Sequence, residues 1–243
     1  MFGRFRYNNE VFYGELKEDT VISQESTFME YDLSELEVLP PSSPSKIVCV
    51  GLNYHDHAKE LGLNVPEEPI LFIKPPSALI GQHGKILYPR NSNRVDFEAE
   101  LAVIIGKKCK SIAYDRAYDV IAGFTCFNDV TARDLQQKDG QWTRAKGFDT
   151  FAPLGPFITP AKDFNPEDAA IRSRVNGELR QDSNISNLIF DVPYLIEFIS
   201  GVMTLEVGDV IATGTPPGVA ELHTGDTVEI EIEGIGTLIN EVA

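Results

Sequence analysis

The sequence has few cysteines, little positive charge and no long apolar run. Its three cysteines, Cys49, Cys109 and Cys126, are odd in number, and two of them fall within apolar segments, so we expect reduced thiols in a cytoplasmic protein. The first residues are charged and aromatic, which is not the pattern of a signal peptide. No apolar run approaches the length of about 20 residues that a membrane-spanning helix needs. These absences predict a cytoplasmic protein without a membrane segment.

Positive charge is scarce, because 21 Lys and Arg residues accompany 37 Asp and Glu residues, for a formal net charge of −16. Nucleic acids and anionic membranes bind basic surfaces, so neither is expected as a partner. An anionic substrate would need local positive charge to be held. Hydrophobic residues make up 42% of the 243 residues, which is typical of a globular protein with a substantial core. The sequence contains neither repeats nor a low-complexity tract.

A segment rich in proline and serine divides the chain. Residues 1–44 are predicted to form a small β unit that begins with a hairpin turning at Asn8-Asn9. The composition of residues 39–45 is typical of a linker. Residues 45–243 contain all the candidate catalytic residues. We therefore expect a small N-terminal β domain followed by a catalytic domain.

The segment from Val95 to Gly106 organises the second domain. Its alternating start and β-branched end predict a single strand. Because side chains alternate faces along a strand, Glu98 and Glu100 should share one face, opposite a core face formed by Phe97, Ala99, Leu101, Val103 and Ile105. One interpretation is a solvated strand face. The apolar run from residue 101 to 105 instead favours a strand covered on both faces, whose carboxylates need a cation such as Mg²⁺, Mn²⁺ or Ca²⁺.

A short helix is predicted after the apolar strand at residues 46–52. Asn53 is a favourable N-cap, and Gly62 is a favourable stop. His57 and Glu60 are three residues apart and share a face, and such a pair can activate water because the carboxylate fixes the imidazole tautomer. The alternative is an ordinary surface pair. A polar helix of two turns is marginal alone, so we expect residues 53–65 to be mobile until a ligand binds.

Three more polar residues lie where a strand ends and a helix begins, a common place for functional side chains. Asp129 follows the apolar strand at residues 120–127 and supplies a third carboxylate. Arg133 and Gln136 lie one turn further on and share a helix face. An arginine fork there would suit a substrate carboxylate.

Two later residues could contact an anionic group. Lys146 lies among aromatic residues and could stabilise developing negative charge, although an exposed loop lysine is an equal alternative. Thr215, in a loop rich in glycine and proline, offers its hydroxyl to an anion.

Together these motifs resemble those of the fumarylacetoacetate hydrolase family. The resemblance extends from about residue 46 to the C-terminus, and the leading β unit is similar to the short N-terminal region of the bacterial and archaeal members. The ordered set of motifs is specific, although no single motif decides it. The motifs are residues 53–60 (NYHDHAKE), 97–101 (FEAEL), 128–136 (NDVTARDLQ), 146–149 (KGFD), 175–178 (VNGE) and 213–216 (TGTP).

The resemblance implies a fold and a role for each candidate residue. The implied fold is mixed α+β and β-rich, a β-sandwich roll with short helices, and it is usually dimeric. The carboxylates that bind Mg²⁺ or Mn²⁺, with Ca²⁺ as the alternative, match Glu98, Glu100 and Asp129. The water-activating pair on a lid helix matches His57 and Glu60, and a catalytic lysine matches Lys146. Residues that hold the oxo-acid end of the substrate match Arg133, Gln136 and Thr215.

The predicted function is a metal-dependent hydrolase that cleaves a carbon–carbon bond in a 2,4-dioxo acid of the acylpyruvate or fumarylpyruvate type. The ion would stabilise the enolate left after cleavage, while Glu60 and His57 deprotonate the attacking water. The alternative is a decarboxylase or oxo–enol isomerase of the same family, acting on oxaloacetate or 2-hydroxyhepta-2,4-diene-1,7-dioate. A metabolite binder with a relic site would have no need of the water-activating pair. The motifs identify neither the tail of the substrate nor the physiological ion.

Overall fold

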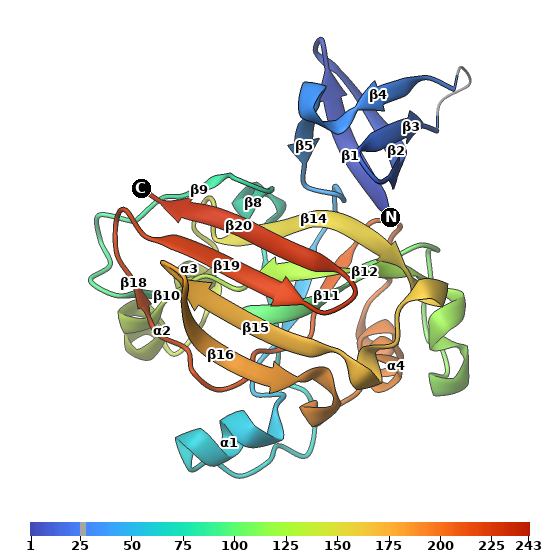
Figure 1. Ribbon diagram of the computed structural model, residues 1–243. Coiled ribbons are helices and arrows are strands. Elements are labelled where there is room, and N and C mark those ends of the chain that lie inside the picture. The colour runs from blue at the N-terminus through green and yellow to red at the C-terminus, as the bar shows by residue number, and fades with distance from the viewer. Residues whose placement is uncertain (25–27) are drawn as a thin grey trace.

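A computed structural model of the protein describes residues 1–24 and 28–243 (Figure 1). Within these residues, the strands form one large sheet, a second sheet that packs against it and a small three-stranded sheet, with short helices around them. The strand order along the large sheet is β4-β3-β2-β1-β14-β12-β11-β17-β6-β7. The fold is therefore mixed α+β and β-rich, as the family resemblance implies.

The large sheet combines strands from the start, the middle and the end of the chain. Its N-terminal strands are β1 (Phe2–Tyr7), β2 (Glu10–Lys17), β3 (Thr20–Ser23), β4 (Glu30–Asp32) and β5 (Glu37–Leu39). Its central strands are β6 (Ile47–Val50), β7 (Leu71–Lys74), β11 (Ala99–Ile105), β12 (Ile121–Asn128), β14 (Ala152–Pro160) and β17 (Val210–Ala212), and β8 (Leu79–Ile80) pairs with β14.

The N-terminal strands stand away from the rest of the molecule (Figure 1). Asn8 and Asn9 have φ values of 46° and 70°, which suits the predicted tight turn between β1 and β2. The unit has an apolar cluster of its own around Phe5 and Phe12. It joins the large sheet where Phe2 pairs with Ile158 of β14. Because the sheet is continuous there, the domain boundary at residue 44 stays a prediction.

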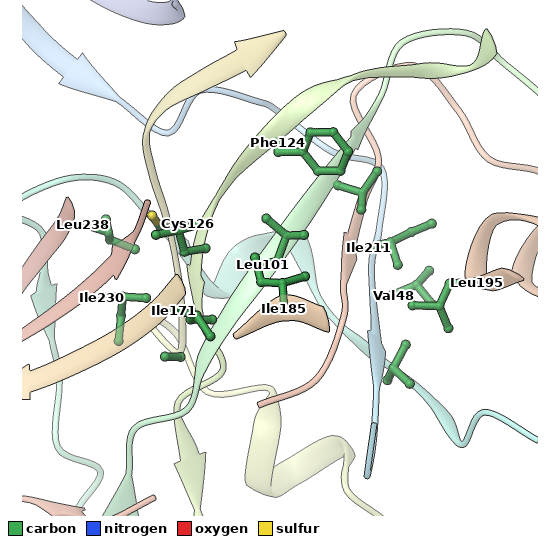
Figure 2. Packing of buried hydrophobic residues seen from close by; sticks show 14 of the residues in the cluster. Val48, Leu101, Phe124, Cys126, Ile171, Ile185, Leu195, Ile211, Ile230 and Leu238 are labelled. Carbon is green, nitrogen blue, oxygen red and sulfur yellow. The ribbon is translucent and has the colours of Figure 1, made fainter. Parts of the chain in front are cut away.

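The second sheet covers one face of the large sheet. It has the order β16 (Glu178–Asn184), β15 (Ala170–Val175), β19 (Thr227–Ile232), β20 (Gly236–Val242) and β9 (Lys85–Ile86). In the core between the two sheets, Leu101 and Cys126 lie close to Ile171, Ile230 and Leu238 (Figure 2). On the same large sheet, Val48 and Ile211 are covered by Leu195 of α4 (Val192–Val202).

The predicted strand at residues 95–106 is interrupted. Val95 and Asp96 form β10, which pairs with β13 (Thr131–Ala132) and β18 (Glu221–Leu222), and β11 begins only at Ala99. Phe97 and Glu98 lie between the two strands, and the Glu98 carbonyl accepts a hydrogen bond from the Asp129 N–H at 2.9 Å. Every residue of β11 is buried. The interpretation of Glu98 and Glu100 as a solvated strand face is therefore wrong.

The helices are short. They include α1 (His55–Leu61), α2 (Arg133–Asp139), α3 (Thr143–Lys146) and the 3₁₀ turns η1 (Leu33–Glu35), η2 (Pro76–Ala78), η3 (Tyr114–Asp119), η4 (Ala161–Asp163), η5 (Pro166–Asp168) and η6 (Ile185–Asn187). Among residues 1–24 and 28–243, no helix has the length and apolar character needed to cross a membrane.

The start of α1 differs from the prediction, and its end agrees with it. Asn53 does not cap the helix: its side chain donates to the Thr213 carbonyl at 2.7 Å and accepts from the Phe190 N–H at 2.8 Å. The amide of Asn53 thus links the start of α1 to two distant loops. Gly62 ends the helix in the left-handed conformation, with φ 64°, as predicted.

Candidate active site and metal centre

Three buried carboxylates converge where the start of β11 pairs with the end of β12. One oxygen atom from each of Glu98, Glu100 and Asp129 lies within 4.8 Å of the others. Two oxygen ligands of a Mg²⁺ or Mn²⁺ ion, each about 2.1 Å from the metal, are at most about 4.2 Å apart. A small contraction of the cluster would therefore give the geometry that such an ion requires.

The backbone around the strand interruption holds these carboxylates in place. The Glu98 N–H donates to the side-chain oxygen of Asn128 at 3.0 Å. Glu100 follows two residues later and receives a hydrogen bond from the Gly214 N–H at 2.9 Å. Asp129 comes directly after β12, the antiparallel partner of β11. Pairing of β11 with β12 thus brings residues 98–100 next to residue 129.

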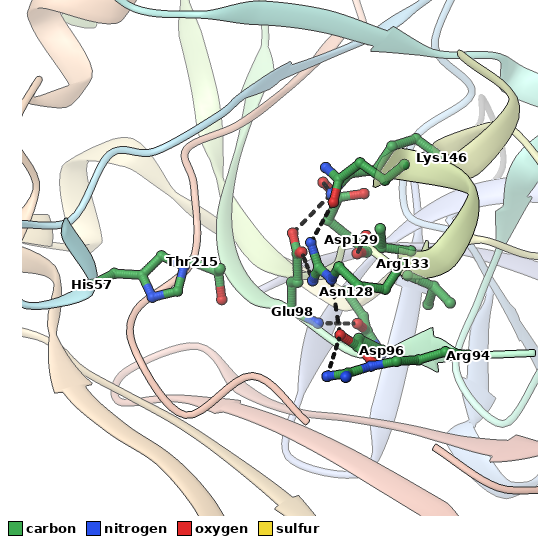
Figure 3. Close-up of polar contacts among 12 residues, drawn as sticks. His57, Arg94, Asp96, Glu98, Asn128, Asp129, Arg133, Lys146 and Thr215 are labelled. Carbon is green, nitrogen blue, oxygen red and sulfur yellow. Dashed lines mark hydrogen bonds and ion pairs between the residues drawn. The ribbon is translucent and has the colours of Figure 1, made fainter. Parts of the chain in front are cut away.

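Cationic side chains surround the carboxylates (Figure 3). The Lys146 Nζ donates to Glu98 at 2.9 Å and to Asp129 at 2.6 Å. Lys74, which is fully buried, pairs with the other oxygen of Asp129 and donates to the Val130 carbonyl at 2.9 Å. Lys146 is also buried, so it is not the exposed loop lysine of the alternative interpretation.

These charges affect the carboxylates unequally. Burial favours the neutral form of Glu98, but Lys146 and Arg133 outweigh it and lower the pKa of Glu98 to about 2. Burial, together with the charges of Asp129 and Glu98, raises the pKa of Glu100 well above its usual value. The nearby cations therefore do not compensate the negative charge of an ionised Glu100. A divalent cation would supply that charge, and the all-oxygen donor set suits a hard ion.

A cavity of about 380 Å³ opens beside the cluster. This volume is within the usual range of small-molecule sites, toward its lower end. The polar residues that line it are His57, Glu98, Glu100, Arg133, Gln136, Gln137, Lys146 and Thr215. A larger cavity, of about 650 Å³, lies by residues 114–118 and 185–194 and contains none of the candidate residues, so volume alone does not locate the site.

His57 and Glu60 form the predicted pair on α1. The His57 Nδ1 is 2.8 Å from a carboxylate oxygen of Glu60, whose other oxygen accepts from the Gly218 N–H at 3.1 Å. Asp56, in the first turn of α1, accepts from the Ser183 hydroxyl at 2.6 Å. The helix is thus linked to β16 and to the Gly218 loop, and His57 faces the same cavity as the carboxylates (Figure 3).

Arg133 connects Gln136, a predicted substrate-binding residue, to the carboxylate cluster. Its guanidinium donates to Gln136 at 2.6 Å, to Asp96 at 2.8 Å and to Glu98. All nine candidate residues therefore belong to one site: eight line the cavity or form the carboxylate cluster, and Glu60 reaches it through His57.

Three contributors were missed by sequence reasoning. Asp96, two residues before Glu98, continues the acidic alternation and could have been found from it. Lys74 ends a strand, but its burial depends on distant residues. Gln181, fully buried on β16, donates to the Thr215 hydroxyl at 2.8 Å and carries no sequence signal for this role.

The sequence and the fold of this chain are similar to those of a known family and of several known proteins. Residues 46–243 match the family described as fumarylacetoacetate (FAA) hydrolase C-terminal. An oxaloacetate tautomerase of Bacillus subtilis is 44% identical over 226 residues, which cover 87% of this chain and 75% of that protein. The crystal structure of a 5-carboxymethyl-2-hydroxymuconate delta-isomerase from Mycobacterium smegmatis is 44% identical, with a TM-score of 0.93 over 100% of this chain and 98% of that chain. A maleylpyruvate hydrolase from Sphingobium sp. SYK-6, in complex with manganese(II) and pyruvate, is 30% identical, with a TM-score of 0.85 and the same coverage of 100% and 98%.

Proposed function

The chain belongs to the fumarylacetoacetate hydrolase family, and we propose that it catalyses the oxo–enol tautomerisation of a small 2-oxo acid with a divalent metal ion. The observation that carries the proposal is that a single cavity is lined by a histidine paired with Glu60 and by a buried cluster of carboxylates and cations. Tautomerisation moves a proton between carbon and oxygen, so it needs a base close to a region that stabilises negative charge.

The relatives support giving tautomerisation precedence over hydrolysis. Proteins named as oxaloacetate tautomerases are 44% and 46% identical to this chain, in Bacillus subtilis and Bos taurus. The maleylpyruvate hydrolase is more distant, at 30% identity. Carbon–carbon bond hydrolysis, the function preferred from the sequence, therefore becomes the second candidate.

Glu98, Glu100 and Asp129 would hold the ion, which we propose is Mg²⁺ or Mn²⁺. When bound, the ion would act as a Lewis acid toward the carboxylate and 2-oxo oxygens of the substrate. Manganese(II) in the maleylpyruvate hydrolase structure supports this choice. The raised pKa of Glu100 is consistent with a position that needs a cation.

Arg133, Gln136 and Lys146 would bind and orient the substrate. Three of the five N–H donors of an arginine are directed to Asp96, Gln136 and Glu98, and the others suit a substrate carboxylate. Burial disfavours the charged form of Lys146, but Asp129 and Glu98 outweigh it and raise its pKa, so it stays protonated. A fixed positive charge at Lys146 would stabilise negative charge on the substrate oxygen.

His57 would transfer the proton. When its Nδ1–H donates a hydrogen bond to Glu60, its Nε2 carries the free lone pair and can act as a base. That nitrogen would take a proton from the carbon next to the oxo group, and the protonated imidazole would then give it to the enolate oxygen; the reverse reaction runs the same transfer backwards. In the second candidate function, the same nitrogen would take the proton from a water molecule that attacks a carbonyl carbon.

The experiment compares two reactions in two variants. Loss of enol oxaloacetate and hydrolysis of an acylpyruvate would be followed by ultraviolet absorbance, with Mg²⁺ or Mn²⁺ and with a chelator. Glu60→Gln should slow tautomerisation by about 10²–10⁴-fold, the usual contribution of a general base. Glu67→Gln, at an exposed position after α1, is the matched control.

The outcomes separate the candidates. Metal-dependent tautomerisation that Glu60→Gln slows and Glu67→Gln does not is the expected result. If the protein hydrolyses the acylpyruvate but does not tautomerise oxaloacetate, the hydrolase function replaces the tautomerase function as the conclusion. Tautomerisation that is insensitive to Glu60→Gln, or to the chelator, would overturn the roles proposed here.

A further inference from the structure

Asp96 is a fully buried carboxylate beside the carboxylate cluster, but it is not one of the three residues that could hold an ion. A buried carboxylate is costly unless cations pair with it. Two arginines do so: the Arg94 Nε donates to one oxygen at 3.0 Å, and the Arg133 Nε donates to the other at 2.8 Å. The Arg94 side chain is 51% exposed and the Arg133 side chain 21%. Asp96 therefore connects an arginine of the surface to the arginine that lines the cavity.

The backbone fixes the position of Asp96 relative to Arg133. Strands β10 and β13 pair antiparallel, with Asp96 opposite Thr131, and the Arg133 N–H donates to the Arg94 carbonyl at 2.8 Å. Arg133 is the first residue of α2, which follows β13 directly. Both side chains thus come from a hydrogen-bonded pair of strands or its immediate continuation, and such elements hold side chains more precisely than loops do.

The Arg133 guanidinium lies between Asp96 and Glu98 (Figure 3). Its Nε–H donates to Asp96, one terminal nitrogen donates to Gln136 at 2.6 Å, and the other terminal nitrogen donates to Glu98. Since an arginine has five N–H groups, each terminal nitrogen keeps one N–H that these contacts do not use. Those two groups are the donors that remain for a ligand in the cavity.

Asp96 also limits the contact between Arg133 and Glu98. An arginine and a carboxylate favour a pair with two parallel hydrogen bonds. The Nε of Arg133 and the terminal nitrogen that bonds to Glu98 form the two arms of such a fork, but Asp96 accepts from the Nε arm. Glu98 therefore receives a single hydrogen bond from Arg133. Without Asp96, the guanidinium would be free to turn and form the two-bond pair with Glu98, which changes the direction of its remaining N–H groups.

We propose that Asp96 is a positioning residue, which fixes the Arg133 guanidinium so that its two remaining N–H groups face a carboxylate of the substrate. Asp96 is not among the residues that line the cavity, so it acts through Arg133. The inference rests on the proposed function, because it concerns the arginine that binds the 2-oxo acid.

The charge of Asp96 and its positioning role have effects of opposite sign. Removal of a negative charge close to the cavity would, by Coulomb interaction alone, strengthen the binding of an anionic ligand. Loss of the orientation of Arg133 would instead weaken that binding. A fall in affinity when Asp96 is replaced therefore reports the orientation of the guanidinium.

The test uses N-oxalylglycine, an unreactive ligand with a 2-oxo acid head, a second carboxylate and no C–H next to the oxo group. Calorimetric titration at saturating Mn²⁺ should show an affinity about 10-fold lower for Asp96→Ala than for the unaltered protein. Asp96→Leu, which fills the volume without an acceptor, should lose as much and takes the place of Asp96→Ala if the smaller side chain prevents folding. Asp96→Asn keeps an oxygen that can accept from the Arg133 Nε, so its affinity should stay within about 3-fold.

Two comparisons separate positioning from general damage to the fold. In the Arg133→Ala background, Asp96→Ala should change the affinity by less than about 3-fold, because no guanidinium is left to position. Asp134→Ala is the matched control: Asp134 follows Arg133 and accepts from Ser92 and Asn93, so its loss perturbs the same junction without removing a contact of the guanidinium. With oxaloacetate, Asp96→Ala should raise KM by about 10-fold and change kcat much less, since the carboxylate is bound in both the ground and the transition state.

Unchanged or tighter binding of N-oxalylglycine by Asp96→Ala would overturn the positioning role and leave the proposed function standing. The same holds if Asp96→Ala costs as much without Arg133 as with it, if Asp134→Ala costs as much as Asp96→Ala, or if Asp96→Asn does. The expected dependence of Asp96 on Arg133, without tautomerisation of any 2-oxo acid, would instead overturn the proposed function alone. Failure of N-oxalylglycine to bind the unaltered protein would overturn the oxo-acid site and the positioning role with it.

Discussion

Gln181 joins β11, β15 and the Thr215 loop through one buried amide. Its oxygen accepts from the Ala99 N–H and the Ser173 hydroxyl, each at 3.0 Å. Its nitrogen donates to the Thr215 hydroxyl at 2.8 Å and the Pro216 carbonyl at 2.7 Å. Gln181→Leu keeps a similar volume and removes all four hydrogen bonds. The substitution therefore tests how much this amide stabilises the site.

The expected loss follows from the groups left without partners. Ala99 and Pro216 are buried, so at least one backbone N–H and one carbonyl would be unpaired. Each unpaired buried group costs about 1–3 kcal/mol, and the free energy of unfolding should fall by about 2–6 kcal/mol. For a chain of this size, 1 kcal/mol shifts the Tm by about 2–4 °C. A decrease in Tm of roughly 10 °C is expected.

Thermal unfolding would be followed by circular dichroism at fixed protein and metal concentrations. The KM for the oxo acid should also rise, because the Thr215 hydroxyl loses its partner. Gln82→Leu is the control: Gln82 is half-buried and bonds to the Thr237 carbonyl and the Ile239 N–H, which water can partly replace. A Tm change below about 2 °C for Gln181→Leu, or a larger change for Gln82→Leu, would refute the reasoning.

Four further predictions concern the ion, acid stability, the lid and assembly. Glu98→Gln should weaken Mn²⁺ binding by at least about 100-fold in calorimetric titration; undiminished affinity would place the ion elsewhere. Burial raises the pKa of Asp209, but hydrogen bonds from Lys46 and Ser45 outweigh it and hold the pKa below its usual value. The stabilisation is then present above the unfolded pKa of about 3.9 and is lost as the pH falls through the lower folded value. Asp209→Asn should therefore be less stable at pH 7 and have a Tm that depends less on pH below about 4; an unchanged pH dependence would contradict this. Residues 53–65 should exchange amide hydrogens fast without ligand and slowly with Mn²⁺ and a 2-oxo acid bound, whereas slow exchange in both states would exclude gating by α1. The protein should be a homodimer in light scattering, since the family and the abundant apolar strands favour one, and a monomer would contradict this.

Local sequence patterns predicted the parts of the structure that depend on near neighbours. The predicted Asn8-Asn9 turn between β1 and β2 has φ values of 46° and 70°, as a tight hairpin turn requires. Glu98 and Glu100 lie together as predicted, although Glu98 precedes β11 and does not belong to the same strand. Helical spacing was enough to bring His57 and Glu60 together. In each case, the residues that decide the geometry are within four positions of one another.

The features that the sequence did not predict depend on partners far along the chain. Asn53 is a residue type that favours the N-cap position. Hydrogen bonds with residues 190 and 213 instead direct its side chain to two distant loops. The interruption at Phe97 and Glu98 arises because β10 pairs with β13 and β18, in a different sheet from β11. Burial of Lys74 depends on Asp129, which is 55 residues away. Such contacts are set by the tertiary fold, and no local propensity reports them.

The position of β17 has a consequence for the newly made chain. This strand of residues 210–212 lies between β6 and β11, which are both synthesised much earlier. Until it leaves the ribosome, those two strands have unpaired apolar edges and cannot form the continuous sheet. The part of the fold that holds the candidate site therefore closes only after residue 212 has been synthesised. A chain interrupted before residue 210 would expose these edges and would be prone to aggregate.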